Sequence, residues 1–137
     1  MTSVVVDTNV LLSFLTDRDA AQQEKASDLL RAAAGRDLEL VLHQQVVTEI
    51  IYVLMNRYGQ SRGHTAEIIA ELLALPGVVT VDRLEWSGVL ALWPKPFRDF
   101  SDAVLAATCR SGRHDAVATF DETFKRLLEG QGLQSYW

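Results

Sequence analysis

The chain opens with TSVVVDT, residues 2–8, a run of three valines with polar residues on both sides. Consecutive β-branched residues bounded in this way are typical of a strand that is buried on both faces of a parallel sheet. The residues that follow, NVLLSFLTD over 9–17, have the periodicity of a helix. We therefore expect Asp7 at the carboxyl end of a buried strand, the edge at which parallel sheets bind ligands.

The same alternation continues to the end of the chain. Further strands are predicted at LELVL (38–42), VVTV (78–81) and DAVATF (115–120), with LQSYW (133–137) as a possible edge strand. Helices are predicted over 19–34, 44–57, 62–75, 84–93, 101–110 and from 121 to Gly130 or Gly132. We predict a single α/β domain over residues 1–137, a three-layer α/β/α architecture around a mostly parallel sheet of four to five strands.

The composition fits one domain in a reducing compartment. A chain of 137 residues with 48% hydrophobic residues supports a single core. Its one cysteine, Cys109, has no partner for an internal disulfide. The first residues lack the basic start of a signal peptide, and no apolar run approaches the ~20 residues of a membrane span. We expect a cytoplasmic protein without a membrane segment.

The net charge of −5 argues against a broad, basic surface for nucleic acids. An acidic chain remains compatible with a nucleic-acid enzyme if its carboxylates gather around divalent cations, because the cations reverse the local field. Arg57, Lys95 and Arg98 are the candidates for contacts with a phosphate backbone.

Two aspartates, Asp7 and Asp121, each follow a predicted strand and precede a helix. Either could be a helix N-cap, a role worth about 1 kcal/mol. A serine would cap without the desolvation that a carboxylate suffers at the end of a buried strand. If the first and fourth strands are neighbours, the two aspartates converge, with the hydroxyls of Thr8 and Thr119 nearby.

Three further acids lie on predicted helices. Glu49 borders the apolar stripe of its helix and has no Lys or Arg within one turn on that face, so it either reaches water at the stripe's edge or has a partner elsewhere. Asp99 and Asp102 are three residues apart at a helix start. Acids at that position favour the helix dipole, but two crowded carboxylates also repel each other unless a cation intervenes.

This set of acids predicts a hard, oxygen-ligand metal site for Mg²⁺ or Mn²⁺. The three histidines, His43, His64 and His114, show no ligand spacing and are interpreted as surface or capping residues. Serine-nucleophile, P-loop and dinucleotide-binding motifs are absent from the sequence.

Four segments, VVVDTNVLL, TEIIYVL, DFSDAVLAAT and ATFDETF, resemble in this order the four acidic motifs of PIN-domain ribonucleases. The similarity is greatest to the short VapC-type toxins of type II toxin–antitoxin systems, and it covers essentially the whole chain. It implies catalytic and metal-binding roles for Asp7, Glu49, Asp102 and Asp121. Asp99 matches an acid present in part of the family, and Thr8 and Asn9 match the polar residues after the first acid.

The resemblance also implies a sheet in the order 3-2-1-4-5 and Mg²⁺- or Mn²⁺-dependent cleavage of single-stranded or structured RNA. It implies homodimerisation and inhibition by a cognate antitoxin. In the mechanism we expect, ions held by the acids activate a water for in-line attack on phosphorus and stabilise the leaving 3′-oxygen. Asp7 and Asp102 would be direct ligands, Glu49 a ligand or the orienter of the water, and Asp121 a ligand to a second ion.

Two alternatives remain at this point. An aspartyl phosphotransfer protein would use Asp7 as its nucleophile, although Asn9 stands where such phosphatases carry a second aspartate. A non-catalytic interaction module would keep the PIN fold without its chemistry. Trp86, Trp93 and Trp137 fit either the core or a partner interface, and the core is favoured because aromatic side chains are more often buried.

Overall fold

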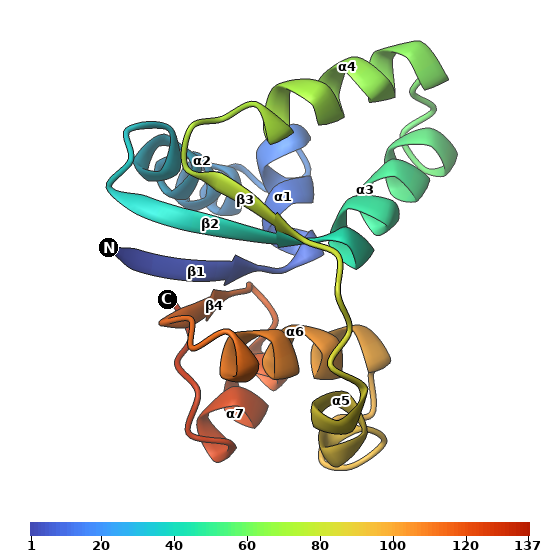
Figure 1. Ribbon diagram of the computed structural model, residues 1–137. Helices are drawn as coiled ribbons and strands as arrows, with labels where there is room; N and C mark the ends of the chain where they lie inside the picture. Colours follow the sequence, from blue (N-terminus) through green and yellow to red (C-terminus); the bar gives the residue numbers. More distant parts are fainter.

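A four-stranded parallel sheet forms the centre of the computed structural model, which describes residues 1–137 (Figure 1). Its strands lie in the order β3-β2-β1-β4. Their bounds are Thr2–Val6 for β1, Leu38–His43 for β2, Val78–Val81 for β3 and Ala116–Ala118 for β4. The predicted order of the first four strands is confirmed. Because β2 and β4 lie on opposite sides of β1, the carboxyl end of β1 is a topological switch point.

Seven helices complete the fold, and they form the two outer layers of the predicted α/β/α architecture. Their bounds are Thr8–Leu15 (α1), Ala20–Ala34 (α2), Gln44–Asn56 (α3), Arg62–Leu73 (α4), Trp86–Leu92 (α5), Phe100–Ser111 (α6) and Glu122–Gly130 (α7). The helices α2 and α3 contact β2, α4 contacts β3, and α6 contacts β1 and β4. Figure 1 shows α1 to α4 on one side of the sheet and α5 to α7 on the other.

The valine run lies at the centre of this sheet. Val4, Val5 and Val6 are completely buried, and Val5 pairs with Val41 of β2 on one side and Val117 of β4 on the other. A central parallel strand is covered on both faces, which explains why three successive apolar residues are needed here instead of an alternating pattern.

The possible edge strand at 133–137 does not form a full strand. This region makes only an isolated parallel bridge between Ser135 and Val117, so the sheet has four strands, within the predicted four to five. The fourth strand is also shorter than predicted. Beyond its carboxyl end, the backbone N–H of Phe120 donates to the Asn9 side chain instead of a neighbouring strand.

The expected burial of the tryptophans is wrong for Trp86, whose side chain is 55% exposed. Trp93 and Trp137 are half-buried, and Trp137 stacks on Phe120 with ring centroids 4.7 Å apart. Cys109 is buried and free, and no helix has the length and apolar character needed to cross a membrane.

Candidate active site

Asp7 lies at the carboxyl end of β1 and is only 8% exposed. Its Oδ1 accepts the backbone N–H of Thr8 at 2.7 Å, so the aspartate caps α1. Its Oδ2 accepts the Thr119 hydroxyl at 2.7 Å and the Asn9 amide at 3.2 Å. Asp7 therefore has the capping role considered from the sequence and, in addition, two side-chain partners that fix its second oxygen.

Thr119 and Asn9 join the ends of β1 and β4. The buried Thr119 hydroxyl also accepts the backbone N–H of Asp121 at 3.1 Å, and Asn9 accepts the N–H of Phe120 at 3.2 Å. Asp121 in turn caps α7 through the N–H of Phe124. The expectation that Asp7 and Asp121 meet at one edge of the sheet is confirmed, because their strands are neighbours.

Glu49, on α3, is held by two hydroxyl groups. Its Oε2 accepts the Thr8 hydroxyl at 2.8 Å, and its Oε1 accepts the Ser101 hydroxyl. The partner expected from the sequence is thus neutral, and the charge of the carboxylate is not balanced by a Lys or Arg. Ser101 was missed from the sequence, and its position between the two acids of the DFSD segment is the only signal that marks it.

Asp99 and Asp102 lie at the start of α6. The exposed Asp99 caps this helix by accepting the backbone N–H of Asp102 at 3.0 Å, and the Asp102 side chain is half-buried. We name the group of five carboxylates at this edge of the sheet the acidic cluster. It comprises Asp7, Glu49, Asp99, Asp102 and Asp121.

The acidic cluster perturbs the protonation of its own members. Burial raises the pKa of Asp7 to about 6, against the opposing effect of hydrogen bonds from Thr119 and Thr8. Burial is also the main reason that the pKa of Asp102 rises to about 8. The negative charges of the other four members raise the pKa of Asp102 further, which places each of them within electrostatic reach of Asp102.

No basic side chain neutralises these carboxylates. The two ion pairs of the chain, Arg31–Asp28 and Lys125–Glu122, lie outside the acidic cluster. None of the histidines takes part either, and His43 instead caps α3, as expected, although it is buried rather than at the surface. The acidic cluster thus brings five carboxyl groups together without a basic side chain paired to any of them.

The acids are not drawn together tightly enough to enclose an ion, since no three acidic, histidine or cysteine side chains form a ready metal-binding group. Hydroxyl and amide donors hold the oxygens of Asp7 and Glu49. The donor set itself, made of carboxylate and hydroxyl oxygens, fits Mg²⁺ or Mn²⁺ and does not fit zinc.

The architecture and the placement of the acids agree with an independent comparison of the sequence with protein families. The model of the PIN domain matches residues 3–123. The chain belongs to the PIN-domain family. No curated protein sequence matches the chain significantly.

Solved structures of VapC-type proteins share this PIN fold. VapC20 of Mycobacterium tuberculosis, described as a sarcin–ricin loop cleaving toxin, is 22% identical with a TM-score of 0.66 over 95% of each chain. VapBC2 of Rickettsia felis, solved with promoter DNA, is 12% identical with a TM-score of 0.72 over 99% of each chain. FitAcB of Neisseria gonorrhoeae is 16% identical with a TM-score of 0.66, over 98% of this chain and 96% of that one. At these identities the likeness establishes the fold.

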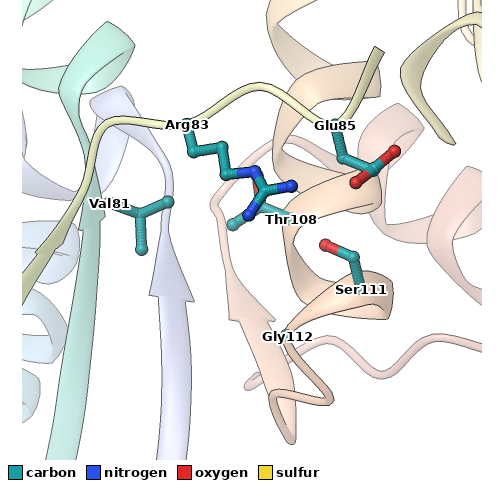
Figure 2. A pocket seen from close by; sticks show the side chains of 6 residues that line it. All are labelled: Val81, Arg83, Glu85, Thr108, Ser111 and Gly112. Atoms are coloured by element: carbon teal, nitrogen blue, oxygen red, sulfur yellow. The ribbon is translucent and has the colours of Figure 1, made fainter. Parts of the chain in front are cut away.

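Figure 2 shows a cavity of this PIN domain, of about 230 Å³, outside the acidic cluster. Arg83 and Glu85, from the β3–α5 connection, extend over it, and Thr108, Ser111 and Gly112 line it from the C-terminal half of α6. No member of the acidic cluster lines this cavity. The expected catalytic acids and this cavity are therefore separate features of the domain.

The Ser101 hydroxyl provides a first test of this geometry. Ser101→Ala removes one of the two donors that hold Glu49, and loss of such a supporting contact typically costs about 10- to 100-fold in metal affinity or activity. We expect RNA cleavage to fall by about that factor, while Ser87→Ala, which alters an exposed hydroxyl on α5, leaves it unchanged. Equal rates for Ser101→Ala and the wild type, measured with a labelled RNA, would show that Glu49 needs no such support.

Proposed function

We propose that this PIN domain is an endoribonuclease that hydrolyses RNA phosphodiester bonds at the acidic cluster with Mg²⁺ or Mn²⁺ as cofactor. The observation that carries the proposal is the convergence of five carboxylates at a switch point without a basic residue among them. Crowding like charges together costs stability, and a bound divalent cation would remove that cost. The acidic cluster is thus more easily explained as a cation site than as a set of helix caps.

The chain's own residues divide into ligands and supports. We assign Asp7 and Asp102 as direct ligands, Glu49 as a ligand or as the group that orients the attacking water, and Asp121 as a ligand to a second, weaker site. Asp99 has a supporting role. A divalent cation bound there would supply Lewis-acid chemistry, lowering the pKa of water and stabilising negative charge on the leaving oxygen.

The hydrogen bonds described above determine how these ligands are held. The hydroxyls of Thr8 and Ser101 fix both oxygens of Glu49, and Thr119 and Asn9 fix the second oxygen of Asp7. Such contacts keep carboxylates oriented before substrate arrives, which reduces the reorganisation needed during the reaction.

We further propose that the protein is the toxin of a toxin–antitoxin pair, acting in the cytoplasm as a homodimer and inhibited by a cognate antitoxin. The support is its similarity in fold to VapC20, described as an RNA-loop cleaving toxin, and to the VapBC2 complex. This assignment is independent of the chemistry of the acidic cluster. If the protein proved not to be a toxin, the proposed reaction could still be correct.

Incubation of a mixed RNA pool with the purified protein in Mg²⁺, Mn²⁺ or EDTA tests the proposed reaction. We expect cleavage only with a divalent cation, and products with 5′-phosphate and 3′-hydroxyl ends, because water attacks phosphorus and the 3′-oxygen leaves. Cleavage that persists in EDTA and leaves 2′,3′-cyclic phosphate ends would contradict the proposal, since it would require attack by the RNA's own 2′-hydroxyl.

The two alternatives predict different observations. A phosphotransfer protein would yield a phosphoryl-aspartate at Asp7 in mass spectra, but Asn9 stands where such phosphatases carry a second aspartate. A non-catalytic module would bind no divalent ion in a calorimetric titration.

A further inference from the structure

An exposed aromatic group borders the acidic cluster on the side of α5 and α6. The Trp86 side chain is 55% exposed, and its ring lies 6.1 Å from that of Phe100, with a tilt of 34° between the planes. The Trp93 ring also packs against Phe100, in an edge-on arrangement with the ring centroids 5.2 Å apart. Phe100 directly precedes Ser101, whose hydroxyl binds Glu49. The Trp86 ring thus lies next to the ring of the residue that precedes Ser101, and Ser101 binds a member of the acidic cluster.

A second exposed aromatic side chain lies on α3, close to Glu49. Tyr52 is 65% exposed and follows Glu49 by three residues on α3, so the two side chains are neighbours on one helix face. Tyr52 and Trp86 are the two most exposed aromatic side chains of the chain. Large aromatic rings are seldom left in water without a partner to cover them.

The segment that carries Trp86 also carries three basic side chains. Residues 82–99 contain three basic and three acidic residues, so this segment is neutral in a chain whose net charge is −5. The basic residues are Arg83, Lys95 and Arg98, and none of them forms an ion pair. Lys95 and Arg98 lie in the α5–α6 connection, held near the aromatic group by a 3.2 Å hydrogen bond from the Trp93 indole to the Arg98 carbonyl.

We propose that Trp86 stacks on an unpaired base of the RNA strand next to the cleaved bond, while Lys95 and Arg98 contact the adjoining phosphates. This inference rests on the proposed function and assigns the side chains that would hold an unpaired stretch of the RNA beside the cleaved bond. Aromatic rings interleaved with cations bind single strands because every base offers a flat face, whereas bases within a duplex are already stacked on one another.

A protein partner would use the same surface differently. Leu90 is 57% exposed and lies one helical turn after Trp86, so an interface with another protein would bury both side chains. A stacked base contacts the Trp86 ring and has no need of Leu90. The pair thus provides a variant and a matched control on the same helix face.

The test measures binding of a short single-stranded RNA that carries 2-aminopurine, in low-salt buffer with EDTA so that the strand stays intact. We expect Trp86→Ala to weaken binding about 10-fold and to relieve the quenching of 2-aminopurine, as removal of one stacking residue typically does. Trp86→Phe should restore most of the affinity, Leu90→Ala should leave it unchanged, and the corresponding duplex should bind more weakly to the wild type. In the cleavage assay, Trp86→Ala should raise KM and leave kcat unaltered.

Several outcomes would overturn the inference. One is an unchanged affinity of Trp86→Ala for the single-stranded RNA. Another is a wild-type protein that binds the duplex more tightly than the single strand. An equal loss in Trp86→Ala and Leu90→Ala, with a change of oligomeric state in light scattering, would assign the surface to a protein partner instead. Weakened binding in Trp86→Ala by a protein that cuts no RNA in any metal would support the stacking and overturn only the catalytic proposal.

Discussion

Asp7→Asn is expected to lower the rate of RNA cleavage by at least about 1000-fold, because it removes a ligand worth several kcal/mol of transition-state stabilisation. Asp7 is the most buried member of the acidic cluster and lies at the carboxyl end of the central strand. The measurement is the initial rate with a labelled RNA in Mn²⁺. Asp17→Asn, which neutralises an exposed acid away from the cluster, is the matched control and should cut at the wild-type rate.

The same substitution should leave the fold intact. Asparagine retains an oxygen that can accept the N–H of Thr8, so the cap on α1 is kept. The raised pKa of Asp7, about 6 against 3.8, means that its ionisation costs the folded state about 3 kcal/mol once the pH exceeds both values. The uncharged asparagine avoids this cost, which offsets the weaker hydrogen bonds that it makes with Asn9 and Thr119. Circular dichroism and thermal melting should match the wild type closely, whereas full activity in this variant would sink the mechanism.

Asp102→Asn is expected to stabilise the metal-free protein at alkaline pH while abolishing its stabilisation by Mn²⁺. A carboxyl with a raised folded-state pKa favours folding at low pH, and its contribution is lost as the pH rises from about 4 through about 8. The amide has no charge to desolvate and none to repel Asp7 or Asp99. It is also a poorer ligand for a hard cation.

Thermal melting from about pH 5 to about pH 9, with EDTA or with Mn²⁺, measures both effects. Without metal, the wild type should lose more stability than Asp102→Asn across this range. With Mn²⁺ at about 100 times its dissociation constant, the wild type should gain about 2.7 kcal/mol, and the variant should gain little. Mn²⁺ that raises Tm equally in both proteins would place the ion somewhere other than at Asp102.

Some of the site could be predicted because a few residues fix the topology. The valine run identifies β1 as a central strand, and its closing Asp7 must then lie at the ligand-binding edge. A neighbouring β4 brings Asp121 to the same edge. For Glu49, an unbalanced acid beside an apolar stripe was enough to infer a partner, but the sequence could not show that the partner would be the two hydroxyls of Thr8 and Ser101.

The rest depends on contacts between distant segments, which local patterns do not encode. Ser101 resembles any polar residue near a helix start until α6 is placed against α3. At the carboxyl end of β4, the bond from Phe120 to the distant Asn9 side chain takes the place of strand pairing. Trp86 lies on a helix of only seven residues, too short for its periodicity to reveal which side faces water.

The central claim is that the acidic cluster cuts RNA with the help of a divalent cation. Its most direct test is one experiment in which the wild type and Asp7→Asn are incubated with the same RNA pool, each in Mn²⁺ and in EDTA. The proposed mechanism predicts cleavage by the wild type in Mn²⁺ alone. Cleavage by Asp7→Asn at the wild-type rate, or by the wild type in EDTA, would contradict it.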